Sequence, residues 1–182
     1  MSRFTALLVL ATLAGCSLDY DAARLSEELD AAIPDTLLIE FTQTIVSDGA
    51  PRFIVSAEQA STFVEQKRQY LDAIAFEELS PEGERITFGT ADTAIVETDT
   101  ENITLTGSLE FYSAEQDAWL TAESLFWDSE ARTLTSPDGE QVVLRRGDDT
   151  EVQGGGFSAD LARSTVRFQD GFSGTIREEA EE

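Results

Sequence analysis

Short runs in which apolar and polar residues alternate follow Pro34 along most of the chain. The clearest run is 103–111, where the alternation is interrupted only at Gly107. Its apolar positions, which share one face of an extended strand, are Ile103, Leu105, Leu109 and Phe111. The polar positions of the opposite face are Thr104, Thr106, Ser108 and Glu110. A period of two therefore predicts a strand with one buried face and one solvated face.

Further strands are predicted at 118–127, 141–146 and 157–161, because these β-branched and aromatic runs are bounded by turn residues. Clusters of Asp, Gly, Ser and Pro at 47–51 and 136–139 mark turns between such runs. Many short strands at regular spacing favour an antiparallel sandwich, barrel or jelly roll.

Two segments need separate interpretation. The C-terminal run is predicted to be one long strand with a bend or bulge near Asp170 and Gly174. Its apolar positions are Val166, Phe168, Phe172 and Ile176. The segment 57–75 is ambiguous, because its Ala, Glu and Gln residues favour a helix, whereas Phe63-Val64 and Tyr70-Leu71 favour strands. We expect strands there.

The first sixteen residues have the pattern of an export signal. Arg3 is followed by an apolar stretch from 4 to 13 and then by Leu13-Ala14-Gly15-Cys16. The stretch is shorter than the ~20 residues that span a bilayer. Leu-Ala-Gly-Cys resembles the lipobox of bacterial lipoproteins, which implies cleavage before Cys16 and lipid attachment to its sulfur. The alternative is an ordinary signal peptide with an incidental cysteine, which would leave a lone thiol in an oxidising compartment.

The pattern predicts a signal peptide at 1–15, a lipid anchor and tether at 16–36, one β domain at 37–176 and an acidic disordered tail at 177–182. The chain has 12 Lys and Arg against 36 Asp and Glu, a net charge of −24. Nucleic acid is therefore not expected as a partner, because phosphate contacts need clustered cations. An anionic membrane would also repel the chain, so the lipid on Cys16 would have to anchor it.

The residue inventory argues against catalysis. The chain has no histidine, and its single cysteine is assigned to lipid, which excludes Ser-His-Asp, Cys-His and His-ligated metal sites. A carboxylate pair of the glycosidase type stays possible in principle, but 36 acidic residues produce pairs by chance. We expect no enzymatic activity, no metal and no cofactor.

Three smaller features have competing interpretations. Residues 99–102 carry oxygen ligands but lack the spacing and glycine of a calcium loop, so a polar turn is predicted. The triplet 154–156 lacks the helix and lysine of a phosphate loop, so these glycines are predicted to let a strand bend or approach another closely. Trp119 and Trp127 fit core packing, and they also suit sugars or lipid tails.

The order of four segments is more specific than any one of them. The segments are Leu-Thr-Gly-Ser-Leu at 105–109, Leu-Thr-Ala-Glu-Ser-Leu-Phe-Trp-Asp at 120–128, Gln-Val-Val-Leu at 141–144 and Val-Gln-Gly-Gly-Gly-Phe-Ser-Ala-Asp at 152–160. In this order they resemble the LptC and LptA (OstA-like) family of periplasmic lipopolysaccharide-transport proteins. The resemblance covers 86–172 and extends more weakly to 53–57.

The resemblance implies an all-β fold, an antiparallel open twisted β-jellyroll preceded here by the signal peptide and short tether. It implies an apolar groove for the acyl chains of lipopolysaccharide or another glycolipid. It also implies edge-strand pairing with LptA-like domains and with the β-jellyroll domains of an inner-membrane transporter. The groove candidates are Ile103, Leu105, Leu109, Phe111, Leu120, Val166 and Phe168. The alternative is a membrane-anchored scaffold or surface lipoprotein, in which the same residues fill a closed β core without lipid cargo.

Two departures from the family bear on location and cargo. LptC proteins typically have an N-terminal membrane-spanning helix, whereas this chain has a lipobox. We expect it on the periplasmic side of a bacterial membrane, with the inner membrane favoured by the resemblance and the outer membrane left open. The strong acidity would repel lipid A phosphates, so a less charged glycolipid is an alternative cargo.

Overall fold

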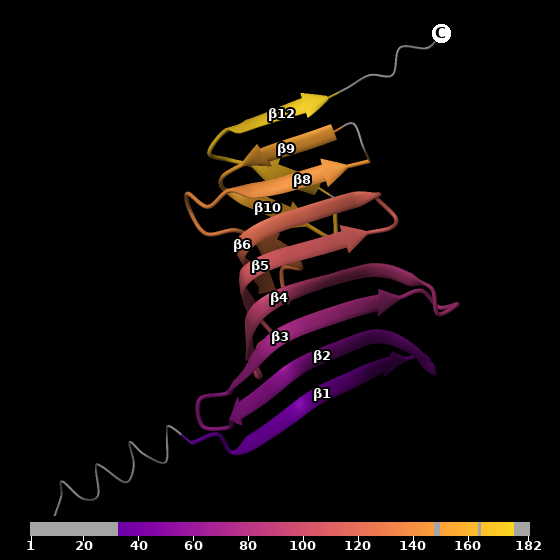
Figure 1. Cartoon of the computed structure of the whole chain (residues 1–182), viewed down its shortest axis with the longest axis vertical. Coiled ribbons are helices and arrows are strands. Elements are labelled where there is room, and N and C mark those ends of the chain that lie inside the picture. The colour runs from indigo at the N-terminus through magenta and orange to yellow at the C-terminus, as the bar shows by residue number, and fades with distance from the viewer. Residues whose placement is uncertain (1–32, 148–149, 164, 177–182) are drawn as a thin grey trace, which may run out of the picture. The chain divides into compact units, whose positions relative to one another are not determined.

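The computed structural model describes residues 33–147, 150–163 and 165–176, and within them the chain forms one antiparallel β-sheet of twelve strands (Figure 1). Six long strands come first: β1 (Thr36–Ser47), β2 (Ala50–Phe63), β3 (Arg68–Leu79), β4 (Arg85–Glu97), β5 (Ile103–Ser113) and β6 (Ala118–Asp128). Six shorter strands follow: β7 (Thr133–Thr135), β8 (Val142–Arg146), β9 (Thr150–Gly154), β10 (Phe157–Asp160), β11 (Thr165–Phe168) and β12 (Phe172–Ile176). No helix suited to crossing a membrane occurs in these residues.

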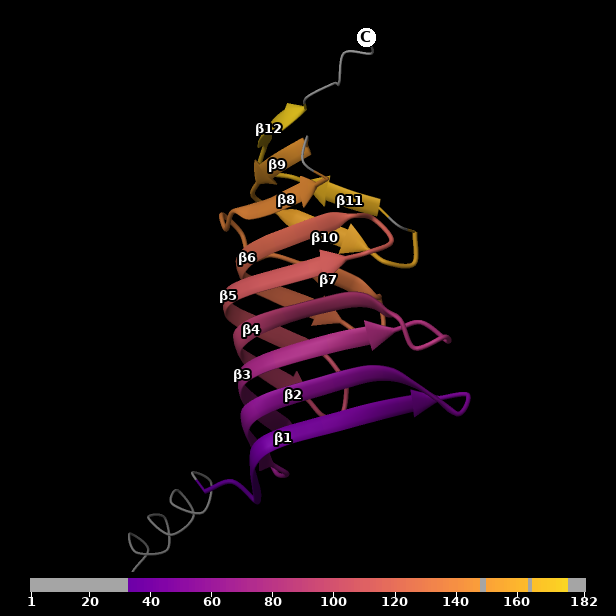
Figure 2. The same ribbon diagram turned by 45° about the vertical axis from the view of Figure 1, so that its right-hand side comes forward.

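Each long strand pairs with the next along the chain, and the sheet then divides at β6. The end of β6 pairs with β7, which leads through β10 to β11. The start of β6 pairs with β8, which leads through β9 to β12. We call the half of the sheet that continues into β7, β10 and β11 the first wall, and the half that continues into β8, β9 and β12 the second wall. Figure 2 shows the two walls one behind the other.

The walls form because the long strands bend near their middles. Glu40, Ala73 and Ser108 adopt left-handed backbone conformations there, with φ of 53°, 50° and 46°. In β3 the buried residues on either side of the bend are Leu71 and Ile74, three positions apart instead of two. The extra residue lies on the outer side, as at a β-bulge, so both walls keep their apolar faces inward.

The core lies between the walls. Residues from both walls gather in one cluster: Ala57, Ala60, Leu71, Ile74, Ala91, Ala94, Leu109, Ala122, Leu125, Val142 and Phe157. Five of these residues are alanines, in β2, β4 and β6, and such small side chains let the walls approach each other there. The arrangement confirms the predicted all-β, open antiparallel β-jellyroll.

The structure confirms one strand prediction and corrects another. The ambiguous segment 57–75 lies in β2 and β3, joined by a turn at 64–67, so the choice of strands was right. The predicted single strand across 166–176 was wrong, because β11 and β12 are separate strands in opposite walls. A turn at 169–171 divides them, and Gly171 in it has a φ of 87°, which favours glycine.

Candidate functional site

The inner face of the sheet is almost free of charge. One cross-strand row at inward positions of the second wall contains Val55, Phe76, Gly89, Phe111, Leu120, Leu144 and Val152. Within the described strands, the charged residues that the register places inward are Glu78 and Arg146, both close to the ends of their strands. In a chain of net charge −24, the carboxylates are therefore concentrated on the outer face and in the turns.

The seven predicted groove residues all take inward positions in the register, but they differ in exposure. Leu109 is fully buried, at 0% exposure, in the core. Five are partly buried and pack against that core: Ile103, Leu105, Phe111, Leu120 and Phe168. Val166 is 47% exposed and lies outside the cluster, because β11 is the last strand of the first wall in the part of the chain that the structure describes.

The apolar inner face is exposed at both ends of the sheet. At the β1 end, the inward residues Leu38 and Ile45 are 40% and 43% exposed. At the other end, Val166 and Phe172 are 47% and 73% exposed. The sequence interpretation did not single out Leu38 or Ile45, and simple alternation would not have found Leu38, because the bend at Glu40 shifts the inward positions from 38 to 41. An apolar inner face thus runs across the sheet and meets solvent at each end.

Glycines let aromatic rings cross this inner face. A Cβ atom on Gly89 would collide with the ring of Phe111, so Gly89 provides the space in which Phe111 lies over β4. The Phe111 ring then contacts Phe76, with centroids 5.3 Å apart. A Cβ on Gly154 would lie 2.9 Å from Cδ1 of Phe168, which confirms the predicted close approach at the glycine triplet. Gly89 carries no sequence signal, because its contact with Phe111 depends on the register of β4 and β5.

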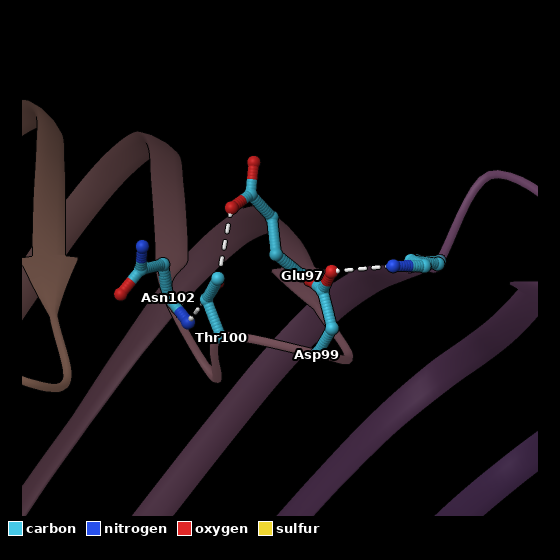
Figure 3. A network of polar contacts seen from close by, with 5 residues as sticks. Glu97, Asp99, Thr100 and Asn102 are labelled. Atoms are coloured by element: carbon cyan, nitrogen blue, oxygen red, sulfur yellow. Dashed lines mark hydrogen bonds and ion pairs between the residues drawn. The ribbon is translucent and has the colours of Figure 1, made fainter.

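The turn at 98–102, at one end of the first wall, is the predicted polar turn. Thr100 donates a hydrogen bond from Oγ1 to Glu97, and Lys67 forms a 2.9 Å ion pair with Asp99 (Figure 3). Hydrogen bonding and charge from Lys67 lower the pKa of Asp99, and Asp99 likewise raises the pKa of Lys67. In the part of the chain that the structure describes, no group of three or more acidic, histidine or cysteine residues is arranged to hold a metal ion.

Cys16, the predicted signal peptide and the tail 177–182 lie outside the described residues, as does most of the tether.

Comparison with known proteins gives a family and a fold. The model of the family described as "Lipopolysaccharide-assembly, LptC-related" matches residues 5–177. Among solved structures, the chain is similar to LptH of Pseudomonas aeruginosa, described as the LptA homologous periplasmic component of the conserved lipopolysaccharide transport device. That match has 13% sequence identity and a TM-score of 0.53, and covers 69% of this chain and 95% of LptH. A search of curated proteins finds no match. At this identity the LptH match establishes a shared fold.

Proposed function

Because the chain belongs to the LptC-related lipopolysaccharide-assembly family, we propose that its β domain is a non-enzymatic component of lipopolysaccharide or glycolipid export that shelters acyl chains between its walls. One observation carries the proposal: an inner face with almost no charged side chains extends across the sheet in a chain of net charge −24. Transfer of an acyl chain from water to such a face contributes ~0.8 kcal/mol per buried CH₂ group.

Lipid entry requires the walls to separate. Leu109, Leu125, Val142 and Phe157 are each at most 2% exposed, so side chains of the two walls fill the interior in this state. An acyl chain would replace the contacts between the walls with contacts of the same apolar kind. The exposed inward residues at either end, such as Leu38 and Phe172, are the points at which this replacement would begin.

Partner domains would pair with the free edges of the sheet. Among the described residues β1 has one neighbour, β2, and the only charged residue of β1 is Glu40 at the bend. At the opposite end, β11 lies at the edge of the first wall and β12 at the edge of the second. Unpaired edges with few charges favour β-augmentation, so LptA-like domains and transporter β-jellyroll domains are the proposed partners.

The proposed location is the periplasmic side of a bacterial membrane, with the protein held there by lipid on Cys16. The pattern Leu13-Ala14-Gly15-Cys16 supports the anchor, and the periplasmic location stated for LptH supports the compartment.

A pair of neighbouring residues on β1 provides the test. A photo-crosslinking amino acid replaces either Leu38, which faces inward, or Ile39, which faces outward, and captured lipopolysaccharide is measured after irradiation. Ile39 is the more exposed of the two, at 64% against 40%, so exposure alone would favour capture at Ile39. We expect capture at Leu38 and none at Ile39. Equal capture at both positions, or none at either in a folded and anchored protein, would reject the carrier.

The second candidate is a scaffold lipoprotein whose core stays closed. The complete burial of Leu109 and Leu125 favours it, because these side chains leave no room for lipid between them in this state. The same experiment separates the two functions, since a closed core captures no lipid at Leu38.

A further inference from the structure

Three aromatic rings form a cluster on the outer face of the second wall. Phe88 of β4, Tyr112 of β5 and Trp119 of β6 are cross-strand neighbours in one row. The ring centroids of Tyr112 and Trp119 are 4.8 Å apart, and the ring of Phe88 meets Trp119 edge-on at 5.8 Å. Two neighbouring rings therefore hold Trp119 in place, although the residue is 42% exposed.

Two ion pairs flank the cluster. On one side the guanidinium of Arg85 lies 4.1 Å from the ring centroid of Phe88 and forms an ion pair with Glu77. On the other side Arg145, next to Trp119 in the cross-strand register, forms a 2.7 Å ion pair with Glu151. Each arginine offsets the charge of its glutamate, so these two ion pairs add no net negative charge beside the cluster.

Hydrogen-bonding groups also line the cluster. The hydroxyl of Tyr112 donates a hydrogen bond to Asp117 at 3.0 Å, which raises the pKa of Tyr112. Asp117 belongs to the turn at 114–117 that joins β5 to β6. The cluster thus combines an exposed aromatic face with charged side chains that donate and accept hydrogen bonds, a combination suited to the apolar faces and hydroxyl groups of sugars.

The cluster lies directly behind the proposed lipid site. Tyr112 follows the inward-facing Phe111, and Trp119 precedes the inward-facing Leu120. The turn at 114–117 forms the lip of the wall between the two faces. Because a strand rises about 3.3 Å per residue, Trp119 lies within about 10 Å of that lip. A head group attached to acyl chains at Phe111 and Leu120 would pass over the lip and reach the cluster.

We propose that Trp119, supported by Tyr112, binds a sugar ring of the core oligosaccharide, beyond the glucosamine rings that lipid A retains, while the acyl chains lie between the walls. This inference rests on the proposed function and adds a second contact to it. A ring already held by its neighbours loses little freedom on binding, which favours it as an anchor for a ligand. The other tryptophan, Trp127, occupies an inward position of the first wall, cross-strand from Ile103, so it is not part of this surface.

The test compares two lipids and two variants in the full-length protein, with the photo-crosslinker at Leu144, an inward position next to Leu120 in the register, as the readout. The lipids are rough lipopolysaccharide that carries core sugars and lipid A prepared from it by acid hydrolysis. The variant is Trp119→Ala. The matched control is Phe126→Ala, which removes an outward aromatic ring of the same strand that is 37% exposed. Trp119→Phe is a second variant, which keeps a ring against Tyr112 if the alanine variant unfolds.

We expect Trp119→Ala to raise the concentration for half-maximal capture of core-bearing lipopolysaccharide on the order of tenfold and to leave capture of lipid A unchanged. Phe126→Ala should change neither. Equal losses for both lipids, or no loss for either, would overturn the sugar site while leaving the carrier intact. Failure of the protein without either substitution to capture any lipid would instead reject the proposed function, and the sugar site with it.

Discussion

Leu109 shows how strongly a single inward residue contributes to this fold. Its side chain is fully buried at the junction of the two walls. Leu109→Ala should lower the free energy of unfolding by about 2–5 kcal/mol, because truncation leaves a cavity that the walls fill only in part. Urea denaturation followed by circular dichroism measures the change. Leu161→Ala, at a position that is 49% exposed, is the control and should change stability by less than about 0.5 kcal/mol. Similar losses in the two variants would contradict the assignment of Leu109 to the core.

For single residues, the sequence predicted which face of the sheet a side chain takes better than it predicted how deeply that side chain is buried. The period of two placed Leu109 and Val166 on inward faces, and the register agrees for both. Their exposure differs because a side chain is buried only where further strands cover it, and none of the described strands lies beyond β11 in its wall. Burial thus depends on strand order, which local alternation does not encode. For the same reason Gly89 gave no signal, since its role comes from a register that places Phe111 opposite.

The ion pair between Lys67 and Asp99 links two turns and should be visible in a pH titration. Lys67 lies in the turn between β2 and β3, and Asp99 in the turn between β4 and β5. Because Lys67 lowers the pKa of Asp99, the carboxylate should titrate below the ordinary range for aspartate. NMR titration of the Asp99 carboxyl carbon measures this, and Lys67→Met should return the pKa toward its ordinary value. An unchanged pKa in Lys67→Met would show that the ion pair does not form in solution.

The sign of the effect on stability follows from the same directions. The folded-state pKa of Asp99 is lowered, so its contribution is present above the unfolded pKa and is lost as the pH falls through the folded value. The folded-state pKa of Lys67 is raised, so its contribution is present below the unfolded pKa and is lost as the pH rises through the folded value. The pair therefore contributes across the neutral range, and weakly, because both side chains are exposed.

At the scale of elements, local patterns located strands but missed one break. The pairs Phe63-Val64 and Tyr70-Leu71 indicated strands within 57–75 despite its helical composition, since strand pairing outweighs weak helix propensity. The alternation across 166–176 continued through a turn, because Phe168 and Phe172 both face inward although they belong to different walls. A period of two reports which face a residue takes and cannot show that the chain has moved to the other half of the sheet.

At the scale of the whole molecule, the jellyroll was predictable from the family resemblance of four segments in their order, whereas the division of the sheet at β6 was not. That division places β8 beside the start of β6 and β7 beside its end. It also leaves β11 and β12 as two separate edges. Pairings between strands far apart in the sequence determine both features, so only the three-dimensional structure shows which inward residues, such as Phe172, remain open to solvent.

The net charge of the whole molecule should determine how its thermal stability responds to salt. With a net charge of −24, repulsion among carboxylates opposes the compact state, and the ion pairs of the described residues lie at the surface and contribute little. Raising sodium chloride to about 0.5 M shortens the Debye length to a few ångströms and should screen the repulsion. We expect Tm to rise by about 2–4 °C, the shift that corresponds to roughly 1 kcal/mol for a domain of this size.

Differential scanning calorimetry at neutral pH measures this change. Tetramethylammonium chloride at equal ionic strength is the control, because screening depends on ionic strength and not on the identity of the cation. A rise with both salts supports repulsion as the cause. A fall in Tm would mean that the surface ion pairs outweigh the repulsion, and a rise with sodium alone would point to specific cation binding. Stabilisation by both salts would also indicate that the carboxylates repel one another in the folded protein, which fits their concentration outside an inner face that is almost free of charge.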